Sequence, residues 1–233
     1  LLIVDIIRSC PIPDVRWCVI SFDEMTKCQN MKSALDAKSI KPEFNCIEGG
    51  STVECMKLIE GGYADMMSVD AADLYVAGHQ FGLVPIAVEY YGDRTNYSAV
   101  AIVKKIDPYI TISSLKNHRT CHSGIGKATG WVIPINLILE TKQINVYDKK
   151  LLYAFSELVA RACIPGAIDR DYNPNYFNGI NLCEVCAGEN TWKCARDTRE
   201  NYYGDSGAFR CLLEAGDVAF AKHTTVRENT GGR

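Results

Sequence analysis

The 233-residue sequence has no apolar run long enough to cross a membrane, and it carries little excess charge. A membrane-spanning helix needs about 18 consecutive apolar residues, so an integral membrane segment is excluded for this stretch of chain. The 25 basic and 28 acidic residues give a net charge of -3, which argues against binding nucleic acid through its phosphates. Proline and glycine are few and 47% of the residues are apolar, which excludes a disordered chain. The length predicts one large globular domain or two of about 100 residues.

Motifs of several enzyme classes are also missing. The Gly-rich stretch 123–130 does not have the G-x-G-x-x-G spacing, and no Walker Gly-Lys-Ser/Thr occurs, so nucleotide binding is not indicated. Ser206 lies in Asp-Ser-Gly-Ala rather than in a Gly-x-Ser-x-Gly elbow, so a hydrolase triad with His223 is not indicated. We therefore expect a protein that is not an enzyme.

Cysteine is abundant, with 11 residues, which is typical of an oxidised, secreted protein. Because 11 is odd, at least one cysteine is free or pairs outside this chain. A zinc site around Cys183 and Cys186 is the alternative, but a second CxxC or a CxxH at finger spacing is missing. The first residues, 1–7, have no basic n-region and include Asp5, so they are the remnant of a signal peptide or a strand rather than an intact leader.

Strand-like and helix-like patterns alternate along the chain. We expect strands at 15–22, 43–47, 64–69, 83–91, 97–105, 119–122 and 218–221. We expect helices at 23–37, 51–60, 71–77, 131–139, 149–162 and 206–213, a helical turn near Ser113, and disulfide-held loops over 163–200. Ser51 and Glu54 form a capping-box pattern at the start of the second helix. This rhythm predicts an α/β fold with a mixed, mainly parallel sheet and helices on both faces.

The Gly-rich loop 123–130 follows a predicted strand and precedes a predicted helix. Gly124, Gly126 and Gly130 let the backbone curl so that several amides point at one spot, and the helix N-terminus favours negative charge there. Lys127 adds a full positive charge. The loop therefore predicts an anion site, with a tight strand-to-helix connection that binds nothing as the alternative.

Five ordered motifs are spread from about residue 14 to residue 230: Val15-Arg-Trp-Cys18, Cys121-His-Ser-Gly-Ile-Gly126, Gly130-Trp-Val-Ile-Pro134, Tyr203-Gly-Asp-Ser-Gly-Ala-Phe-Arg-Cys211 and Gly216-Asp-Val-Ala-Phe-Ala-Lys-His-Thr-Thr225. Together they resemble the N-terminal part of a transferrin lobe, with a melanotransferrin-like or invertebrate-transferrin-like character.

This resemblance implies a disulfide-rich, two-subdomain lobe of the periplasmic-binding-protein type. We expect an N-terminal extension at 1–13, a first subdomain at 14–94 and a second at 95–233, with a hinge crossing at 92–95. In the family the chain then returns to the first subdomain. That return segment is missing here, so we expect a truncated lobe whose first subdomain is incomplete.

Transferrin lobes bind Fe(III) through one Asp, two Tyr, one His and a bidentate carbonate, and hard oxygen donors suit this hard cation. The resemblance implies that Asp70 and Tyr97 are metal ligands. The second Tyr position is Asp205 in this sequence, and the His ligand falls in the missing return segment. His223 matches a different histidine that is not a ligand.

The carbonate site is altered in the same way. The family's Thr is Ser123, which keeps the hydroxyl, and its Arg is Lys127, which keeps the charge but loses the bidentate fork. Thr129 and Gly130 occupy the positions of the backbone donors. The resemblance also implies five disulfides, Cys18–Cys55, Cys28–Cys46, Cys121–Cys211, Cys163–Cys186 and Cys183–Cys194, and leaves Cys10 to pair with the missing part or with another chain.

Each site residue also has a structural alternative. Asp70 can cap the helix that follows it, Tyr97 can be a half-buried hinge residue, and Asp205 can cap helix 206–213. Lys222 and His223 can be structural residues at a strand end, with pH sensing as the alternative for the histidine. Asn96-Tyr97-Ser98 is a glycosylation sequon, which marks a candidate glycoprotein, and we expect it to be unused at a hinge.

Two functions follow from the resemblance. The first is an extracellular, secreted or cell-surface lobe for iron transport that binds Fe(III) with synergistic carbonate at a weakened or altered site. The second is a lobe that kept the fold without iron and serves adhesion, matrix assembly or partner binding. The expected partners are Fe(III) and carbonate, the remainder of the lobe or a second lobe, and a receptor, membrane-surface or matrix protein.

Overall fold

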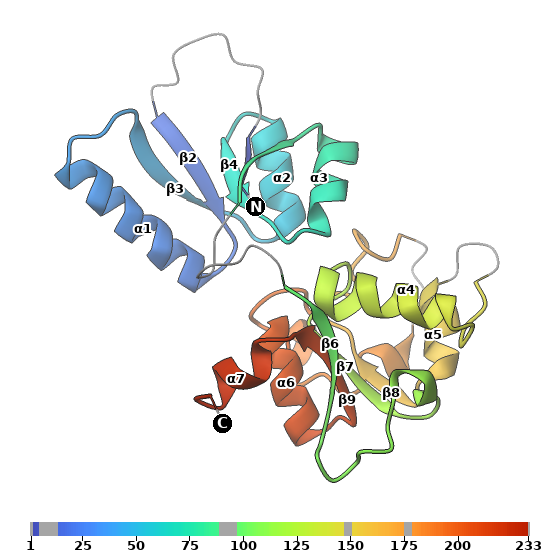
Figure 1. Cartoon of the computed structure of the whole chain (residues 1–233). Coiled ribbons are helices and arrows are strands. Elements are labelled where there is room, and N and C mark those ends of the chain that lie inside the picture. Colours follow the sequence, from blue (N-terminus) through green and yellow to red (C-terminus); the bar gives the residue numbers. More distant parts are fainter. Residues whose placement is uncertain (1, 5–13, 89–96, 147–150, 175–178, 233) are drawn as a thin grey trace. The chain divides into compact units, whose positions relative to one another are not determined.

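The computed structural model describes residues 2–4, 14–88, 97–146, 151–174 and 179–232. The chain divides into two compact units, Leu1–Thr95 and Asn96–Arg233, each built from a sheet and helices (Figure 1). Cys10, the sequon asparagine Asn96 and the predicted hinge at 92–95 lie outside the described residues. Among the described helices, none is both long and apolar enough to span a bilayer.

The first unit contains a five-stranded sheet in the order β3-β2-β4-β1-β5. Its strands are β1 (Leu2–Val4), β2 (Asp14–Val19), β3 (Glu43–Glu48), β4 (Met66–Ser68) and β5 (Val84–Ala87). Strand β2 runs parallel to β3 and β4, whereas β1 is antiparallel to β4 and β5. Of the segment expected to be an N-terminal extension, residues Leu2–Val4 form a strand of this sheet, which is one of the two alternatives for the start of the chain.

Helices cover both faces of this sheet because side chains alternate along each strand. Trp17 and Val19 of β2 pack with Cys28 of helix α1 (Phe22–Ala37). Cys18 points to the other face, where it packs with residues of α2 (Thr52–Glu60) and α3 (Asp73–Phe81). The two faces therefore have separate apolar clusters, as a sheet between two helical layers requires.

Local capping signals explain where α2 begins. The Ser51 hydroxyl accepts a hydrogen bond from the Glu54 amide at 3.1 Å, as predicted. The Glu54 carboxylate accepts in turn from the Gly50 amide at 2.9 Å, one residue before the partner that the capping box predicts. Both bonds satisfy amides that the helix itself leaves without a carbonyl.

The second unit contains a four-stranded sheet in the order β6-β9-β7-β8. Its strands are β6 (Ala99–Val103), β7 (Arg119–His122), β8 (Arg161–Cys163) and β9 (Val218–Lys222). Strand β7 runs parallel to β8 and β9, and β6 is antiparallel to β9. The helices are α4 (Ile133–Glu140), α5 (Leu151–Leu158), α6 (Gly204–Glu214) and α7 (Thr225–Asn229). The predicted α/β class with mixed, mainly parallel sheets is confirmed.

Two elements of this unit differ from the prediction. The helix expected over 149–162 ends at Leu158, and Arg161–Cys163 forms β8 instead. Pairing with β7 and the disulfide from Cys163 fix this strand, and both are contacts that local sequence does not encode. Helix α7 was not predicted. The described residues between 164 and 200, which exclude 175–178, are mainly turns with two short 3-10 helices, η3 (Ile180–Leu182) and η4 (Asn190–Trp192).

The described residues form five disulfides, two in the first unit and three in the second. These are the five pairs that the resemblance implies. They are Cys18–Cys55 and Cys28–Cys46 in the first unit, and Cys121–Cys211, Cys163–Cys186 and Cys183–Cys194 in the second. The Cys121–Cys211 bond spans 90 residues and ties β7 to α6. In the chain-entropy picture each bond contributes roughly 2–4 kcal/mol.

Candidate functional site

The Gly-rich loop joins β7 to a π-helical turn, η2 (Ala128–Val132), which continues directly into α4. Gly126 adopts a φ of 74°, a left-handed conformation that favours glycine. The Ser123 carbonyl accepts a hydrogen bond from the Gly204 amide at 2.9 Å, so the loop is tied to the N-terminus of α6. π-Helical turns occur often at functional sites. The loop therefore brings two helix N-termini together in one unit.

The side chain of Ser123 is the clearest sign of a ligand at this loop. Ser123 is fully buried, and its hydroxyl has no hydrogen-bond partner within the structure. A Cβ added to Gly130 would lie 2.0 Å from that hydroxyl oxygen, so only glycine fits beside it. Buried hydroxyls are usually satisfied, and an anion or a water molecule at this position would supply the missing acceptor.

Lys127 precedes η2 and is half-buried. Its ammonium lies 4.8 Å from the centre of the Tyr203 ring, a cation–π contact that holds the charge near the start of α6. The amides of Thr129 and Gly130 lie in the first turn of η2, where a helix leaves N–H groups without intrahelical acceptors. These four predicted anion-site residues, Ser123, Lys127, Thr129 and Gly130, lie on one continuous segment between β7 and α4.

Asp205 lies in the first turn of α6 and connects this loop to β9. One carboxylate oxygen accepts hydrogen bonds from the Thr129 hydroxyl at 3.1 Å and from the Lys222 amide at 3.3 Å. The other oxygen lies 3.6 Å from the Lys222 ammonium. The N-cap residue of α6 is Tyr203, so Asp205 does not occupy the capping position that the sequence offered as an alternative.

Tyr97 lies two residues before β6 and approaches the same lysine. The Lys222 ammonium lies 5.0 Å from the centre of the Tyr97 ring. Tyr97 and Asp205, which are 108 positions apart in the sequence, therefore flank one cation within the second unit. Lys222 was not among the predicted ligands, and its place at the end of a strand gave no signal of this contact.

Asp70 belongs to the first unit and follows β4. One of its carboxylate oxygens accepts a hydrogen bond from the Ala72 amide at 3.1 Å, which forms a turn before α3. This bond explains why α3 begins at Asp73 rather than at residue 71 as predicted. The N-cap residue of α3 is Ala72, so Asp70 forms a turn ahead of the helix rather than its cap, and its role as a ligand stays a prediction.

His223 lies next to the end of β9 and hydrogen-bonds to the residue before β6. Its Nδ1 accepts a hydrogen bond from the Ser98 amide at 3.1 Å, and its own amide donates to the Ser98 carbonyl at 3.0 Å. The side-chain bond extends the β6–β9 ladder by one residue. This arrangement favours the structural alternative for His223.

Two buried charged residues that the sequence did not single out have structural roles in the second unit, and one of them, Arg196, contacts the Gly-rich loop. Arg196 donates from Nε to the Ile125 carbonyl at 2.7 Å, and its guanidinium stacks on Tyr172 at 4.0 Å from the ring centre. Glu200 is 1% exposed and accepts hydrogen bonds from four backbone amides. Arg196 acts over 71 residues, so a local motif could not have indicated it.

The described residues contain one cluster of potential metal ligands, Cys163, Cys186 and Glu200. The two cysteines form a disulfide, and the glutamate is satisfied by amides, so this cluster does not bind a metal. Cys183 is likewise oxidised with Cys194. The zinc alternative for the Cys183–Cys186 pair is therefore excluded.

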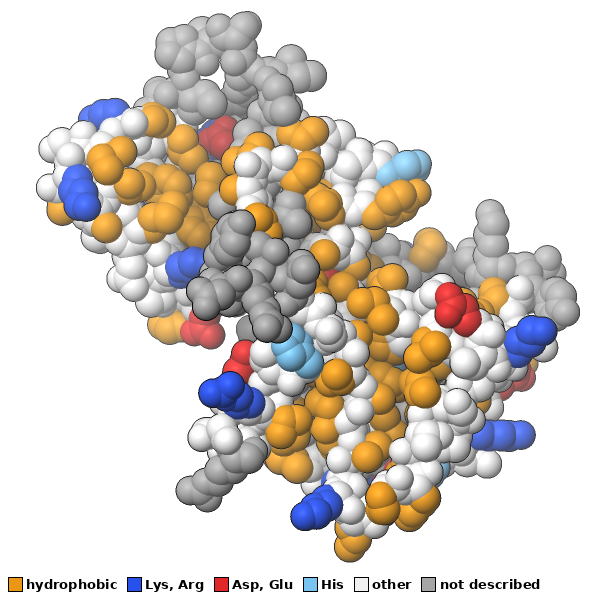
Figure 2. Space-filling model, viewed as in Figure 1, with side chains coloured by type: hydrophobic (Ala, Val, Ile, Leu, Met, Phe, Trp, Pro, Cys, Tyr) orange, Lys and Arg blue, Asp and Glu red, His pale blue; other side chains and the backbone are white. Residues whose placement is uncertain are grey.

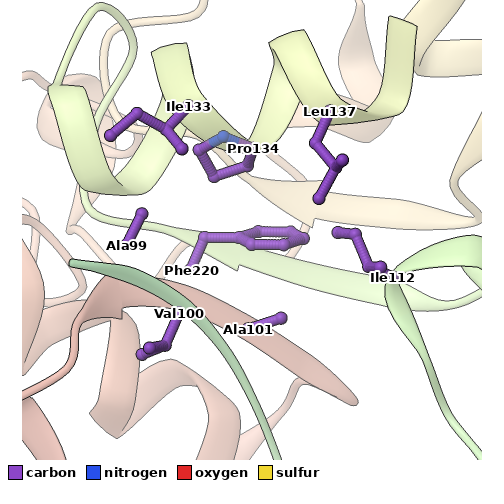
Figure 3. Close-up of a pocket in the computed structure, with 8 residues that line it drawn as sticks. All are labelled: Ala99, Val100, Ala101, Ile112, Ile133, Pro134, Leu137 and Phe220. Carbon is purple, nitrogen blue, oxygen red and sulfur yellow. The ribbon is translucent and has the colours of Figure 1, made fainter. Parts of the chain in front are cut away.

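An apolar pocket of about 190 Å³ lies between β6 and α4 (Figure 3). Its wall includes Phe220, Pro134 and Leu137, which face one another in the close-up, together with small aliphatic side chains. Figure 2 shows hydrophobic side chains gathered on this face of the second unit. Because the wall is aliphatic and aromatic, the pocket supplies no oxygen donor for a metal and no cationic group for an anion.

Comparison with known proteins places the chain in a family. The family model for Transferrin matches residues 15–233. The chain is 42% identical over 232 residues to Transferrin 2 of Drosophila melanogaster, which covers 97% of this chain and 28% of that protein. It is 39% identical over 225 residues to human melanotransferrin, which covers 94% of this chain and 30% of that protein.

Otolith matrix protein 1 of Danio rerio is 35% identical over 225 residues, which cover 94% of this chain and 61% of that protein. The chain thus spans less than a third of the first two relatives and less than two thirds of the third. The fold, the five disulfides and the extent of these matches agree with the resemblance read from the motifs. The chain belongs to the transferrin family.

Proposed function

We propose that this lobe binds Fe(III) together with carbonate, and that the second unit contributes Tyr97, Asp205 and the loop 123–130. The observation that carries this proposal is the convergence of Tyr97 and Asp205 on the Lys222 ammonium. The Lys222 ammonium lies between the Tyr97 ring and the Asp205 carboxylate. We expect a metal cation to bind in the same region, with the phenol and the carboxylate as its ligands. Phenolate, carboxylate and carbonate oxygens are hard donors, which match a hard trivalent ion.

The anion is expected to bind before the metal. The N-terminus of η2 and the Lys127 ammonium both favour negative charge, and Ser123 has a buried hydroxyl without a partner. Without an anion these same groups would repel Fe(III). Carbonate at the loop would neutralise them and present its own oxygens to the metal, so metal uptake is expected to require bicarbonate.

The altered residues predict a weaker site than one with two phenolates. Asp205 already accepts two hydrogen bonds and pairs with Lys222, so the metal has to compete with that ammonium. Asp70 stays our predicted ligand from the first unit. We further propose an extracellular or cell-surface location, because five disulfides persist in oxidising surroundings and are rare in the cytosol.

The experiment that tests this function is the replacement of Tyr97 by phenylalanine. We expect Y97F to lose the charge-transfer absorption of tyrosinate bound to iron and to bind Fe(III) at least tenfold more weakly, a loss of about 1.4 kcal/mol or more. Iron is supplied as ferric nitrilotriacetate with bicarbonate, and both the absorption and the bound iron are measured.

The matched control is Y109F. Tyr109 is 70% exposed and its hydroxyl donates to Asp107, away from the loop. This variant should bind iron as the wild-type protein does. If Y97F keeps the full absorption band, Tyr97 is not a ligand and the proposed site is wrong.

A second function has its own support. The relative named Otolith matrix protein 1 aligns over 94% of this chain. The Asp205–Lys222 ion pair also satisfies internally the charge that a metal would otherwise balance. A lobe without iron that serves matrix assembly or partner binding is therefore the alternative, and it predicts no difference in absorption between Y97F and the wild type.

A further inference from the structure

His122 is the last residue of β7 and is fully buried. Its Nδ1 lies 2.8 Å from the Gly130 carbonyl oxygen, and its Nε2 lies 3.0 Å from the Thr120 hydroxyl. A carbonyl oxygen only accepts, so Nδ1 carries the proton and donates to Gly130. The Nε2 lone pair then accepts from Thr120, which fixes one tautomer of the ring.

The residue four positions after Gly130 is Pro134, which has no amide hydrogen and so cannot donate to the Gly130 carbonyl as an α-helix would require. The imidazole N–H of His122 supplies a donor to this carbonyl. The bond spans 8 residues and joins the end of the strand to the first turn of η2.

Three aromatic rings pack around the imidazole of His122. The rings of Trp131, Phe155 and Phe220 lie with their centres 5.5, 5.4 and 5.0 Å from that of His122. Burial lowers the pKa of His122 to about 4, so the ring is neutral at physiological pH. A neutral, caged imidazole with a single tautomer is a rigid support for the carbonyl that it contacts.

Gly130 also touches the unsatisfied hydroxyl of Ser123, the residue that follows His122. Two consecutive residues therefore contact Gly130: His122 donates to its carbonyl, and the Ser123 hydroxyl packs against its Cα. We propose that His122 is a positioning residue of the anion site, whose hydrogen bond to the Gly130 carbonyl anchors the first turn of η2, which carries the Thr129 and Gly130 amides, to the end of β7 so that these amides can bind a planar oxyanion. This inference rests on the proposed function, because it assigns a role within the same site.

The test compares two amide replacements, H122N and H122Q, in the full chain. The asparagine side chain places its amide nitrogen near the position of Nδ1, so it can still donate to Gly130. The glutamine side chain reaches the Nε2 position instead. Bicarbonate binding is measured by calorimetry without iron, and we expect H122Q to bind about tenfold more weakly while H122N stays within about threefold of the wild type.

A third variant, F155L, separates positioning from general packing. It removes one ring of the cage and leaves both hydrogen bonds of His122 in place. Thermal unfolding of all variants shows how much stability each loses. F155L is expected to lose stability comparable to H122Q and to keep its bicarbonate affinity, which supports a positioning role for His122.

The other outcomes distinguish a failure of the anion site from a failure of the positioning role of His122. If the wild type does not bind bicarbonate, the proposed function and the inference both fail. If the wild type binds but H122Q binds equally well, the anion site stands and His122 does not position it. If F155L and H122Q weaken binding equally, the role of His122 is packing alone. If H122Q does not fold, H122F, which keeps an aromatic ring but has no donor, replaces it: a tenfold loss of bicarbonate affinity supports the inference, and an unchanged affinity overturns it.

Discussion

Replacement of Glu200 by alanine is expected to lower the free energy of unfolding of the second unit by about 4 kcal/mol, since hydrogen bonds to a charged group contribute about 1.5–3 kcal/mol each and are not additive. The buried carboxylate accepts from the amides of Ala187 and Tyr202 at 2.9 and 3.0 Å, and from those of Gly188 and Cys194 at 2.8 and 2.7 Å. Alanine leaves all four amides without this acceptor.

Chemical denaturation with the disulfides kept oxidised measures this effect. The control is E184A, because Glu184 is 42% exposed and pairs with Arg161 at the surface. An exposed ion pair contributes about 0–1 kcal/mol, so E184A should unfold almost as the wild type does. A change below about 1 kcal/mol in E200A would contradict the view that this carboxylate organises the disulfide-held loops.

Replacement of Asp205 by tyrosine is expected to raise the affinity for Fe(III) at least tenfold, or about 1.4 kcal/mol. A phenolate is a hard donor with a longer reach than a carboxylate, and the change also removes the ion pair that ties Lys222 to position 205. The absorption of tyrosinate bound to iron should become more intense, because a second phenolate joins Tyr97.

Removal of the carboxylate without adding a phenol provides the matched control. D205N loses the charge of Asp205 and supplies a weaker donor, so it should bind iron more weakly than the wild type. Affinities of D205Y and D205N are compared by competition with a ferric chelator in bicarbonate buffer. Equal affinities would mean that position 205 does not contact the metal.

Local signals in the sequence predict much of this fold. The serine before α2 and the glutamate three residues later set its start, and β7 matches its predicted range of 119–122. Strand β8 was missed, because the helical pattern of α5 continues past Leu158, whereas pairing with β7 and the disulfide from Cys163 fix Arg161–Cys163 as a strand. Contacts between distant segments therefore decide the places where the prediction was wrong.

The same distinction holds at the site. Residue types indicated the Gly-rich loop, whereas Asp205 was indicated by the resemblance to a transferrin lobe. The contact between Asp205 and Lys222 was not predicted, because it depends on how α6 packs against β9. Arg196 gave no signal either, since it lies 71 residues from the carbonyl that it supports.

The most direct test of the central claim is the visible absorption spectrum of the wild-type protein titrated with Fe(III), with and without bicarbonate. The proposed site predicts a charge-transfer band from the Tyr97 phenolate that develops only when bicarbonate is present. A spectrum that stays flat under both conditions would contradict it, because no tyrosinate–iron bond would then form in this lobe.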